Sequence, residues 1–362
     1  MSRPIGEQVV VVTGASSGVG RACVRAFAAE GARVGLIARN EEALAVAARE
    51  VHEAGGEALV LPLDVANSDA VEDAAAKVEA RWGRIDTWVN DAMVSVFSPA
   101  LEMQMEEFRR ITDVNYLGCV YGTMSALRRM RRQDEGVIVQ VCSALAYRSI
   151  PLQSAYCASK AAMRAFSDSV RSELIHDGSK VRLSVLILPA VNTPQFNVVK
   201  TRLPRHPQPV PPIYQPELIA EAALYAAQHH VREMVIGSGA LKAVVGQKFI
   251  PGLLDRYVAA TCYDGQQTDK PVDANRPDNL FAPVPGDPGC HGMFDSRARS
   301  GSVQYWLRTH PRLLALGAAA GAALGSLAAQ RRARQPEPEP PSLLQRVVED
   351  VLPQALAQRL HA

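Results

Sequence analysis

An apolar run followed at once by a glycine-rich turn constrains this chain more than any other feature. Residues 8–13 read Gln-Val-Val-Val-Val-Thr, a pattern typical of a strand buried on both faces of a parallel sheet. The next seven residues, 14–20, read Gly-Ala-Ser-Ser-Gly-Val-Gly, and an alanine-rich helical stretch then continues to Glu30. Strand, turn and helix in this order predict the first unit of a layered α/β domain.

The glycine turn predicts a site for a dinucleotide. Glycines let backbone N–H groups approach a pyrophosphate closely, and the amino terminus of the following helix attracts the same anion. A chance glycine-rich turn is the alternative, because such a motif is only a hypothesis outside its structural context. The candidate cofactor-binding residues of the turn are Gly14, Ser16, Ser17, Gly18, Val19 and Gly20.

Six further apolar runs follow along the chain and alternate with alanine-rich helical segments. This alternation is the βαβ rhythm of a parallel sheet with helices on both faces. It predicts an α/β fold, a Rossmann-type doubly wound parallel sheet of about seven strands, with a loop-rich carboxyl-terminal extension and a helical tail. The predicted strands lie near residues 8–13, 33–38, 57–62, 85–90, 137–142, 181–188 and 232–237.

A tyrosine and a lysine stand four residues apart, at Tyr156 and Lys160. Positions i and i+4 of a helix share a face, and a cation within about 4 to 6 Å of a phenol favours its phenolate form. The pair therefore predicts that Lys160 lowers the pKa of Tyr156 and makes it a general acid and base. Ser143, at the end of a predicted strand, could hold a substrate oxygen against the phenol. A solvated helix edge is the alternative interpretation of the pair.

The spacing Gly-x-x-x-Gly-x-Gly, combined with Tyr-x-x-x-Lys at 156–160, resembles the short-chain dehydrogenase/reductase family. The resemblance spans residues 6–240. Further positions fall in the order of that family, and it implies that they contribute to the cofactor site or to catalysis. These positions are Asp64, Val65, Asn90, Asn115, Ser143, Pro189 and Thr193.

The resemblance implies a catalytic tetrad of Asn115, Ser143, Tyr156 and Lys160. In that scheme Tyr156 exchanges a proton with the substrate oxygen, and Ser143 positions that oxygen. Lys160 lowers the pKa of the tyrosine and binds the nicotinamide ribose. Asn115 holds a water that links Lys160 to solvent.

Two departures from the family pattern lie near the expected cofactor. Met93 stands where a glycine is usual after the fourth strand, and Ala190 follows Pro189 where another glycine is usual. Thr193 also lies one residue closer to that proline than in many members. We expect these changes to reshape the nicotinamide pocket while the tetrad stays intact.

The tip of the second strand predicts the choice of cofactor. A carboxylate there would bind the ribose 2′-hydroxyl of NAD and repel a 2′-phosphate, whereas an arginine attracts the phosphate. The chain has Arg39 at this point and no acid beside it, so NADP(H) is the predicted cofactor. A solvated arginine that opens the next helix is the alternative.

Length and composition agree with an enzyme domain that carries an appendage. The 362 residues can bury a full core and leave an excess, and a net charge of +2 argues against a nucleic-acid partner. The six cysteines contain no Cys-x-x-Cys pair, and the eight histidines show no metal-ligand spacing. We therefore expect no metal site and buried, reduced thiols, as in cytosolic proteins.

The carboxyl-terminal third differs in character from the rest. Residues 264–300 are rich in proline, glycine and aspartate, which predicts an extended or partly disordered wrap without chemistry of its own. The predicted organisation is a catalytic Rossmann-fold domain at 1–250, a loop-rich extension at 251–305, a hydrophobic helix at 306–334, a Pro/Glu linker at 335–341 and an amphipathic helix at 342–362.

Residues 313–329 form an uncharged run bracketed by arginines, close to the lower length limit of a transmembrane helix. A membrane anchor, an interfacial helix and a soluble packing helix are the three interpretations. No apolar segment typical of a secretory signal precedes the first strand, so we expect a cytoplasmic catalytic domain, tethered to a membrane or untethered. The amphipathic tail would bind a membrane, a partner or its own catalytic domain.

Together these patterns predict an NADPH-dependent carbonyl reductase, or equivalently an NADP-linked alcohol dehydrogenase, for a hydrophobic substrate. Met93, Leu145 and Gln153 are the expected pocket residues, and the proline-rich segment 194–216 is the expected lid. One alternative is a membrane-anchored NADPH-binding scaffold without turnover. Another is an epimerase or dehydratase, because related folds also use a Tyr-x-x-x-Lys pair. The resemblance also implies a homodimer or homotetramer that pairs through long helices.

Overall fold

The computed structural model describes residues 3–311 apart from residue 274, together with residues 313, 322, 326 and 327. The chain divides into two compact units, Met1–Thr309 and His310–Ala362. The first unit holds every predicted site residue. Most of the predicted hydrophobic run at 313–329, the whole Pro/Glu linker and the amphipathic tail lie outside the described residues.

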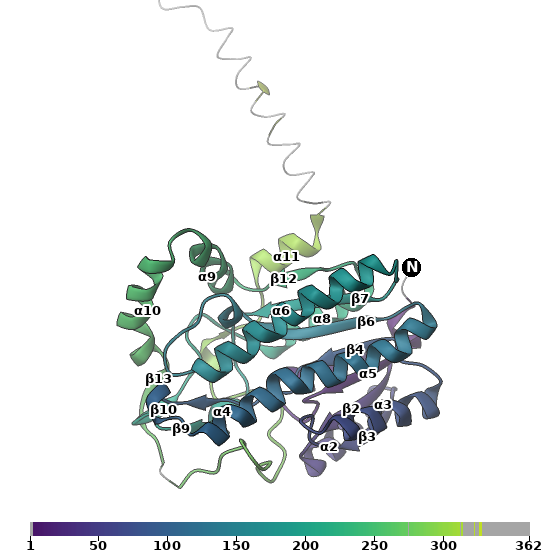
Figure 1. Ribbon diagram of the computed structural model, residues 1–362, viewed down its shortest axis with the longest axis horizontal. Coiled ribbons are helices and arrows are strands. Elements are labelled where there is room, and N and C mark those ends of the chain that lie inside the picture. The colour runs from purple at the N-terminus through teal and green to yellow at the C-terminus, as the bar shows by residue number, and fades with distance from the viewer. Residues whose placement is uncertain (1–2, 274, 312, 314–321, 323–325, 328–362) are drawn as a thin grey trace, which may run out of the picture. The chain divides into compact units, whose positions relative to one another are not determined.

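A seven-stranded sheet forms the centre of the first unit (Figure 1). Its strands are β1 (Val9–Thr13), β2 (Arg33–Ala38), β3 (Glu57–Pro62), β4 (Thr87–Asn90), β6 (Val137–Ser143), β7 (Arg182–Leu188) and β12 (Glu233–Val235). They lie in the order β12-β7-β6-β4-β1-β2-β3, and every neighbouring pair is parallel. The predicted fold class is confirmed. The order reverses between β1 and β4, the point at which doubly wound sheets bind ligands.

Helices cover both faces of the sheet, because successive side chains of each strand point to opposite faces and both sets are apolar. Val10 and Val12 of β1 belong to a core cluster with one group of helices, and Val9 and Val11 belong to a cluster with the other group. The first group is α1 (Gly18–Ala29), α2 (Glu41–Glu53) and α8 (Pro216–Gln228). The second group is α3 (Ser68–Trp82), α5 (Gly118–Gln133) and α6 (Ser154–His176).

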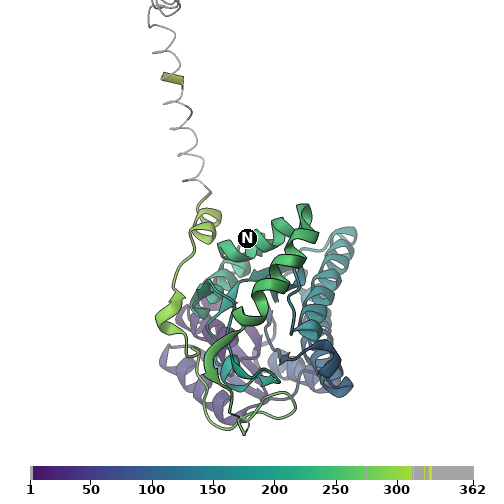
Figure 2. The same cartoon turned by 90° about the vertical axis from the view of Figure 1, so that its left-hand side faces the viewer.

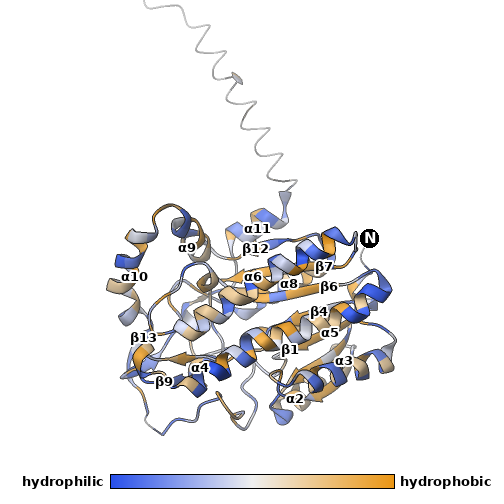
Figure 3. Ribbon diagram, in the orientation of Figure 1, coloured by the Kyte–Doolittle hydropathy of each residue, from blue (hydrophilic) through white to orange (hydrophobic). Residues whose placement is uncertain are grey.

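Hydropathy follows these layers. The central strands are hydrophobic along most of their length, whereas the outer faces of the helices are hydrophilic (Figure 3). All six cysteines are buried and unpaired, as predicted. Among the described residues, no helix combines the length and the apolar character needed to cross a bilayer.

Among the described residues, short strands form small sheets separate from the seven-stranded sheet, and these join the connections to the extension (Figure 2). The pairs are β5 (Val96–Phe97) with β9 (Lys200–Thr201), β10 (Arg205–Pro207) with β13 (Gln267–Pro271), and β11 (Ile213–Tyr214) with both β8 (Ala190–Val191) and β14 (Ala298–Arg299). The remaining α-helices are α4 (Met105–Thr112), α7 (Gln195–Val198), α9 (Ser238–Phe249), α10 (Pro251–Gly265) and α11 (Val303–Thr309). Because β13 and β14 come from the extension, the extension packs with the sheet domain.

Candidate active site

The glycine turn joins β1 to α1, and its outer glycines are required by close contacts. Gly14 has φ +76°, in the left-handed region that favours glycine. A Cβ on Gly20 would lie 2.2 Å from the carbonyl oxygen of Gly14, so α1 can begin against the end of β1 only with glycine there. Gly20 therefore allows α1 to pack closely against β1. The other predicted cofactor-binding residues of the turn line a large cavity.

A cavity of about 1400 Å³ runs past the ends of the central strands. It is larger than the usual ligand pocket of about 300 to 1,000 Å³, so it has room for more than one small molecule. The predicted substrate residues Met93, Leu145 and Gln153 line it. So do most of the predicted catalytic and cofactor residues, namely Gly14, Ser16, Ser17, Gly18, Val19, Arg39, Asp64, Val65, Ser143, Tyr156, Lys160, Pro189 and Thr193.

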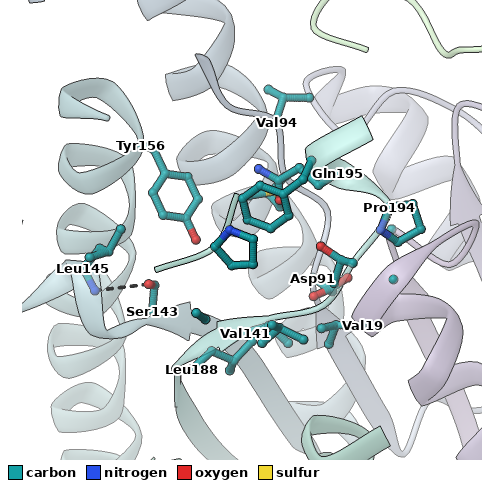
Figure 4. A pocket seen from close by; sticks show the side chains of 18 of the residues that line it. Val19, Asp91, Val94, Val141, Ser143, Leu145, Tyr156, Leu188, Pro194 and Gln195 are labelled. Carbon is teal, nitrogen blue, oxygen red and sulfur yellow. Dashed lines mark hydrogen bonds between the residues drawn. The ribbon is translucent and has the colours of Figure 1, made fainter. Parts of the chain in front are cut away.

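Tyr156 and Ser143 lie on the same side of this cavity and come from different elements (Figure 4). Tyr156 lies in the first turn of α6, and Ser143 is the last residue of β6. The backbone N–H of Leu145 donates to the Ser143 hydroxyl oxygen at 3.1 Å, which leaves the Ser143 O–H as a donor. The two hydroxyls therefore form a polar pair in a wall that is otherwise largely apolar.

The pKa of Tyr156 is raised, chiefly because burial disfavours the phenolate. A hydrogen bond with Ser143 acts in the opposite direction and is the smaller effect. The Tyr-Lys spacing predicted a lowered pKa, and this prediction is wrong. Desolvation of the phenolate raises the pKa by more than the hydrogen bond with Ser143 lowers it. A phenol with a raised pKa stays protonated at neutral pH and is suited to donate a proton.

The ammonium group of Lys160 lies close to the phenol of Tyr156 and also donates a hydrogen bond to the backbone of β6. Its Nζ donates to the carbonyl oxygen of Val141 at 2.8 Å and lies 5.8 Å from the centroid of the Tyr156 ring. The side chain is only 2% exposed. The predicted juxtaposition of the ammonium and the phenol is therefore present, with the lysine fixed by the neighbouring strand.

Asn115 lies behind the cavity wall rather than in it. It sits in a π-helical turn, Asp113–Leu117, between α4 and α5, a local feature that is frequent at functional sites. Its side chain accepts a hydrogen bond from the Val94 N–H at 2.8 Å and donates to Val94 O and Ser159 Oγ. The water that the family resemblance implies at Asn115 stays a prediction.

Asn90 is likewise placed in the core and does not line the cavity. Its amide accepts from the Trp88 indole N–H at 2.8 Å and donates to Thr123 and Gln140. The side chain thus ties β4 to α5 and β6. Its predicted contact with the cofactor would have to come from the backbone.

Arg39 reaches the cavity from the end of β2, as predicted, but it already has partners. It donates to the backbone carbonyl oxygens of Asn279 and Leu280, in the extension. Burial, and then the nearby charge of Arg110, lower the pKa of the guanidinium. Arg110 itself pairs with Asp64 and donates to Leu280 O at 3.0 Å. Two guanidinium groups therefore converge beside a single carboxylate.

A family model for short chain dehydrogenases matches residues 8–203, more than half of the chain. The chain belongs to the short-chain dehydrogenase family. It is therefore an oxidoreductase, and the cavity at the switch point of its sheet is the place where the family's motifs meet.

Relatives and solved structures agree with this assignment. An uncharacterized oxidoreductase, YxnA, of Bacillus subtilis (strain 168) is 34% identical over 333 residues, which cover 91% of this chain and 92% of the relative. A fatty acyl-CoA reductase of Acinetobacter baylyi is 28% identical over 66% of this chain and 78% of that protein. An alcohol dehydrogenase of Thermococcus sibiricus, solved with 5-hydroxy-NADP, superposes with a TM-score of 0.55 at 30% identity, over 63% of this chain and 95% of that structure.

Asp91 is a cavity residue of this short-chain dehydrogenase that the motifs did not single out as functional. Its carboxyl group points into the cavity beside the glycine turn (Figure 4). Burial raises its pKa to about 7, against opposing effects of Lys160 and the Gly20 N–H. The signal in the sequence was the position of this aspartate between Asn90 and Met93, directly after the fourth predicted strand.

The outer wall of the substrate side comes from segments beyond the family motifs. The expected lid contributes Phe196, Val210 and Ile213, and α10 contributes Leu254 and Val258. The helical spacing of the apolar positions in α10 was the only sequence signal for its role.

The basic residues of the lid do not point to an anionic ligand, because they already pair with acidic side chains. Lys200 and Arg202 pair with Glu107, and Arg205 pairs with Asp264. These ion pairs hold the lid against α4 and α10.

Proposed function

We propose that this chain is an NADPH-dependent carbonyl reductase that, in reverse, oxidises an alcohol, and that its substrate is a hydrophobic ketone or alcohol. The observation that carries the proposal is the pair of hydroxyls, Tyr156 and Ser143, beside Lys160 in the wall of a large cavity. Such a group can bind and protonate an oxygen, and the cavity has room for a dinucleotide next to it.

The residues divide the work by their surroundings. NADPH, when bound, supplies the hydride that reduces the carbonyl carbon. Ser143 donates a hydrogen bond to the carbonyl oxygen, since its own oxygen is held by the Leu145 N–H. Tyr156, protonated because its pKa is raised, gives its proton to that oxygen as negative charge develops. The ammonium of Lys160 then stabilises the phenolate that remains.

The preference for NADPH rests on Arg39, at the end of β2, and on Arg110 of α4. Arg39 and Arg110 lie close together beside Asp64, and an anionic 2′-phosphate would offset their mutual repulsion. The carbonyl oxygens of Asn279 and Leu280 take only part of the donors of Arg39, since a guanidinium has five N–H groups. The solved relative from Thermococcus sibiricus carries an NADP derivative, which supports the same choice.

The hydrophobic substrate is supported by the lining of the cavity beyond Tyr156. Apolar side chains from the lid, from α10 and from the loop after β6 gather there, so an apolar substrate would bury hydrophobic surface against them. The similarity to a fatty acyl-CoA reductase agrees with an apolar substrate.

The test is NADPH oxidation by the purified full chain with aliphatic, aromatic and long-chain carbonyl compounds. Tyr156→Phe is expected to lower kcat about 100- to 10,000-fold, the usual contribution of a general acid, and to leave NADPH binding in place. Tyr121→Phe, on α5 and outside the cavity, is the matched control and is expected to keep full activity. Tight binding of NADPH with no turnover of any carbonyl would instead favour the scaffold alternative.

A further inference from the structure

The extension returns to the cavity and crosses the rim of the sheet. Residues 279–290, here called the strap, pass over the ends of β1 and β2, and Figure 1 shows this light-green chain running back beside the purple amino-terminal elements. Leu280, at one end of the strap, is fully buried in the core cluster of α3, α5 and α6. Cys290, at the other end, is buried in the cluster of α1, α2 and α8. The strap therefore runs from one face of the sheet to the other.

The first half of the strap is held by the arginines of the proposed phosphate site. Arg39 donates to Asn279 O and Leu280 O, and Arg110 donates to Leu280 O. The backbone N–H of Asn279 donates to Val198 O at 3.0 Å, which ties the same end to the lid. These groups fix the strap backbone directly above the end of β2.

The second half is held by the start of α2 and by the glycine turn. The amide of Asn40 donates to Val284 O and Gly286 O, each at 2.9 Å, and the Gly286 N–H donates to Glu42 at 3.0 Å. The Gly289 carbonyl oxygen accepts from the backbone N–H of Gly18 at 3.0 Å. The strap is thus bound to the same turn that the family uses for a dinucleotide.

The strap covers the cavity rather than filling it. Asn279 and the run from Pro283 to Pro288 line the cavity together with the glycine turn, and about 1400 Å³ remains open between them and the site residues. Most strap residues expose their other side to solvent, as Pro283, Pro285, Asp287 and Pro288 do. A ligand on the glycine turn would therefore lie beneath the strap.

We propose that the strap is the outer wall of the adenosine and pyrophosphate half of the dinucleotide site and must open for NADPH to enter or leave. This inference rests on the proposed function only in taking NADPH as the ligand. Arg39 binds the strap and, in the proposed function, also binds the 2′-phosphate. Bound NADPH would therefore hold Arg39 in place and stabilise the closed strap. Release of the cofactor is then limited by detachment of the strap.

The test measures association and release of NADPH by stopped-flow fluorescence with the full chain. Leu280→Ala removes the buried anchor of the strap and is expected to raise both rate constants at least tenfold. Leu174→Ala, which truncates a buried leucine at the far end of α6, is the matched control and is expected to change them less than twofold.

A second pair of variants avoids any change in the core. Glu42→Ala releases the Gly286 N–H and is expected to raise the release rate about threefold, whereas Glu41→Ala, which removes a neighbouring exposed acid of the same helical turn, is expected to leave it unchanged. Hydrogen exchange adds a readout that needs no variant: strap amides are expected to gain protection when NADPH binds.

Each outcome decides the inference. Release rates that stay equal in Leu280→Ala and Leu174→Ala, or strap amides that NADPH does not protect, overturn it. Faster association with unchanged release overturns it in another way, because the strap would then compete with NADPH for the site. Failure of the unmodified chain to bind NADPH at all would overturn the proposed function and the inference together.

Discussion

Arg39 is the residue that most directly tests the proposed choice of cofactor. Replacement by alanine is expected to raise the Kd of NADPH about 10- to 100-fold, because hydrogen bonds to a charged group contribute about 1.5 to 3 kcal/mol. NADH has no 2′-phosphate, so it loses no hydrogen bond between charged groups. Its Kd is therefore expected to change less than about threefold. Fluorescence titration with both nucleotides measures the difference.

The same variant separates two roles of Arg39. An equal loss of affinity for NADPH and NADH would contradict the phosphate assignment and leave the arginine only its contacts with the carbonyls of Asn279 and Leu280. Arg109→Ala, on the exposed face of α4 one residue before Arg110, is the matched control for the lost charge and is expected to change neither Kd.

Asp91 gives the folded protein a pH dependence whose sign can be worked out. Its pKa is raised from 3.8 to about 7 by burial, so between about pH 4 and pH 7 it stays neutral in the folded protein and ionises in the unfolded chain. The folded state therefore binds the additional proton, and its stability falls as the pH rises through this window. The cost is greatest above pH 7.

Asp91→Asn should remove that cost. We expect the variant to gain about 1 to 3 kcal/mol in free energy of unfolding at pH 8 relative to its effect at pH 4, where the native carboxyl is neutral. The side chain of Asp91 is partly exposed, so screening by solvent keeps this gain below the value for a fully buried carboxyl group. Urea unfolding at both pH values measures the gain; the same effect at both would refute the assignment.

At the scale of elements, the contact between α1 and β1 depends on Gly20. Alanine there would place its Cβ 2.2 Å from Gly14 O and 2.8 Å from a carboxyl oxygen of Asp91, so the helix must move away from the strand. We expect a loss of about 1 to 3 kcal/mol in free energy of unfolding, the usual cost of overpacking. Gly252→Ala in α10 meets no described atom within 4 Å outside its own helical turn and is the control, with a change of less than about 1 kcal/mol.

The elements that the sequence predicted well share one property, which is that their signals are local. The seven strands are short apolar runs, and the glycine turn and the Tyr156–Lys160 pair are fixed spacings within one strand, turn or helix. Local geometry carries such spacings into the fold unchanged. The same reasoning placed Ser143 correctly, because a side chain at the carboxyl end of a buried strand must emerge at the rim.

What the sequence did not predict depends on contacts between distant segments. The strap joins Asn279 and Leu280 to Arg39 across about 240 residues, and its proline- and glycine-rich composition is typical of disorder. The pKa of Tyr156 is another such case: the spacing to Lys160 predicts a lowering, whereas burial, which depends on the packing of the whole domain, raises it. Neither the composition of the strap nor the Tyr-Lys spacing indicates which distant segments will pack together, so neither predicts the strap contacts or the burial of Tyr156.

At the scale of the whole molecule, the catalytic unit ends after α11 and not before it. Gln304 of α11 donates to Val235 O, and Arg308 donates to Glu233 O at 2.7 Å, so the helix is attached to β12 at the edge of the sheet. Tyr305 also packs against the core cluster of α1, α2 and α8. The predicted start of the hydrophobic segment at residue 306 therefore falls within an element of the first unit, which extends to Thr309.

This boundary predicts how two truncations behave. A chain that ends at Thr309 is expected to keep its Tm within about 2 °C and its kcat/KM within about twofold, because it keeps the hydrogen bonds of Gln304 and Arg308 to β12. A chain that ends at Ser302 lacks α11 and is expected to melt about 2 to 4 °C lower, which corresponds to roughly 1 kcal/mol for a unit of this size. A membrane anchor after Thr309, one of the three interpretations of residues 313–329, predicts that only the full chain floats with anionic lipid vesicles. Equal flotation of the full chain and the chain ending at Thr309 would refute the tether, because the membrane contact would then lie in the unit Met1–Thr309.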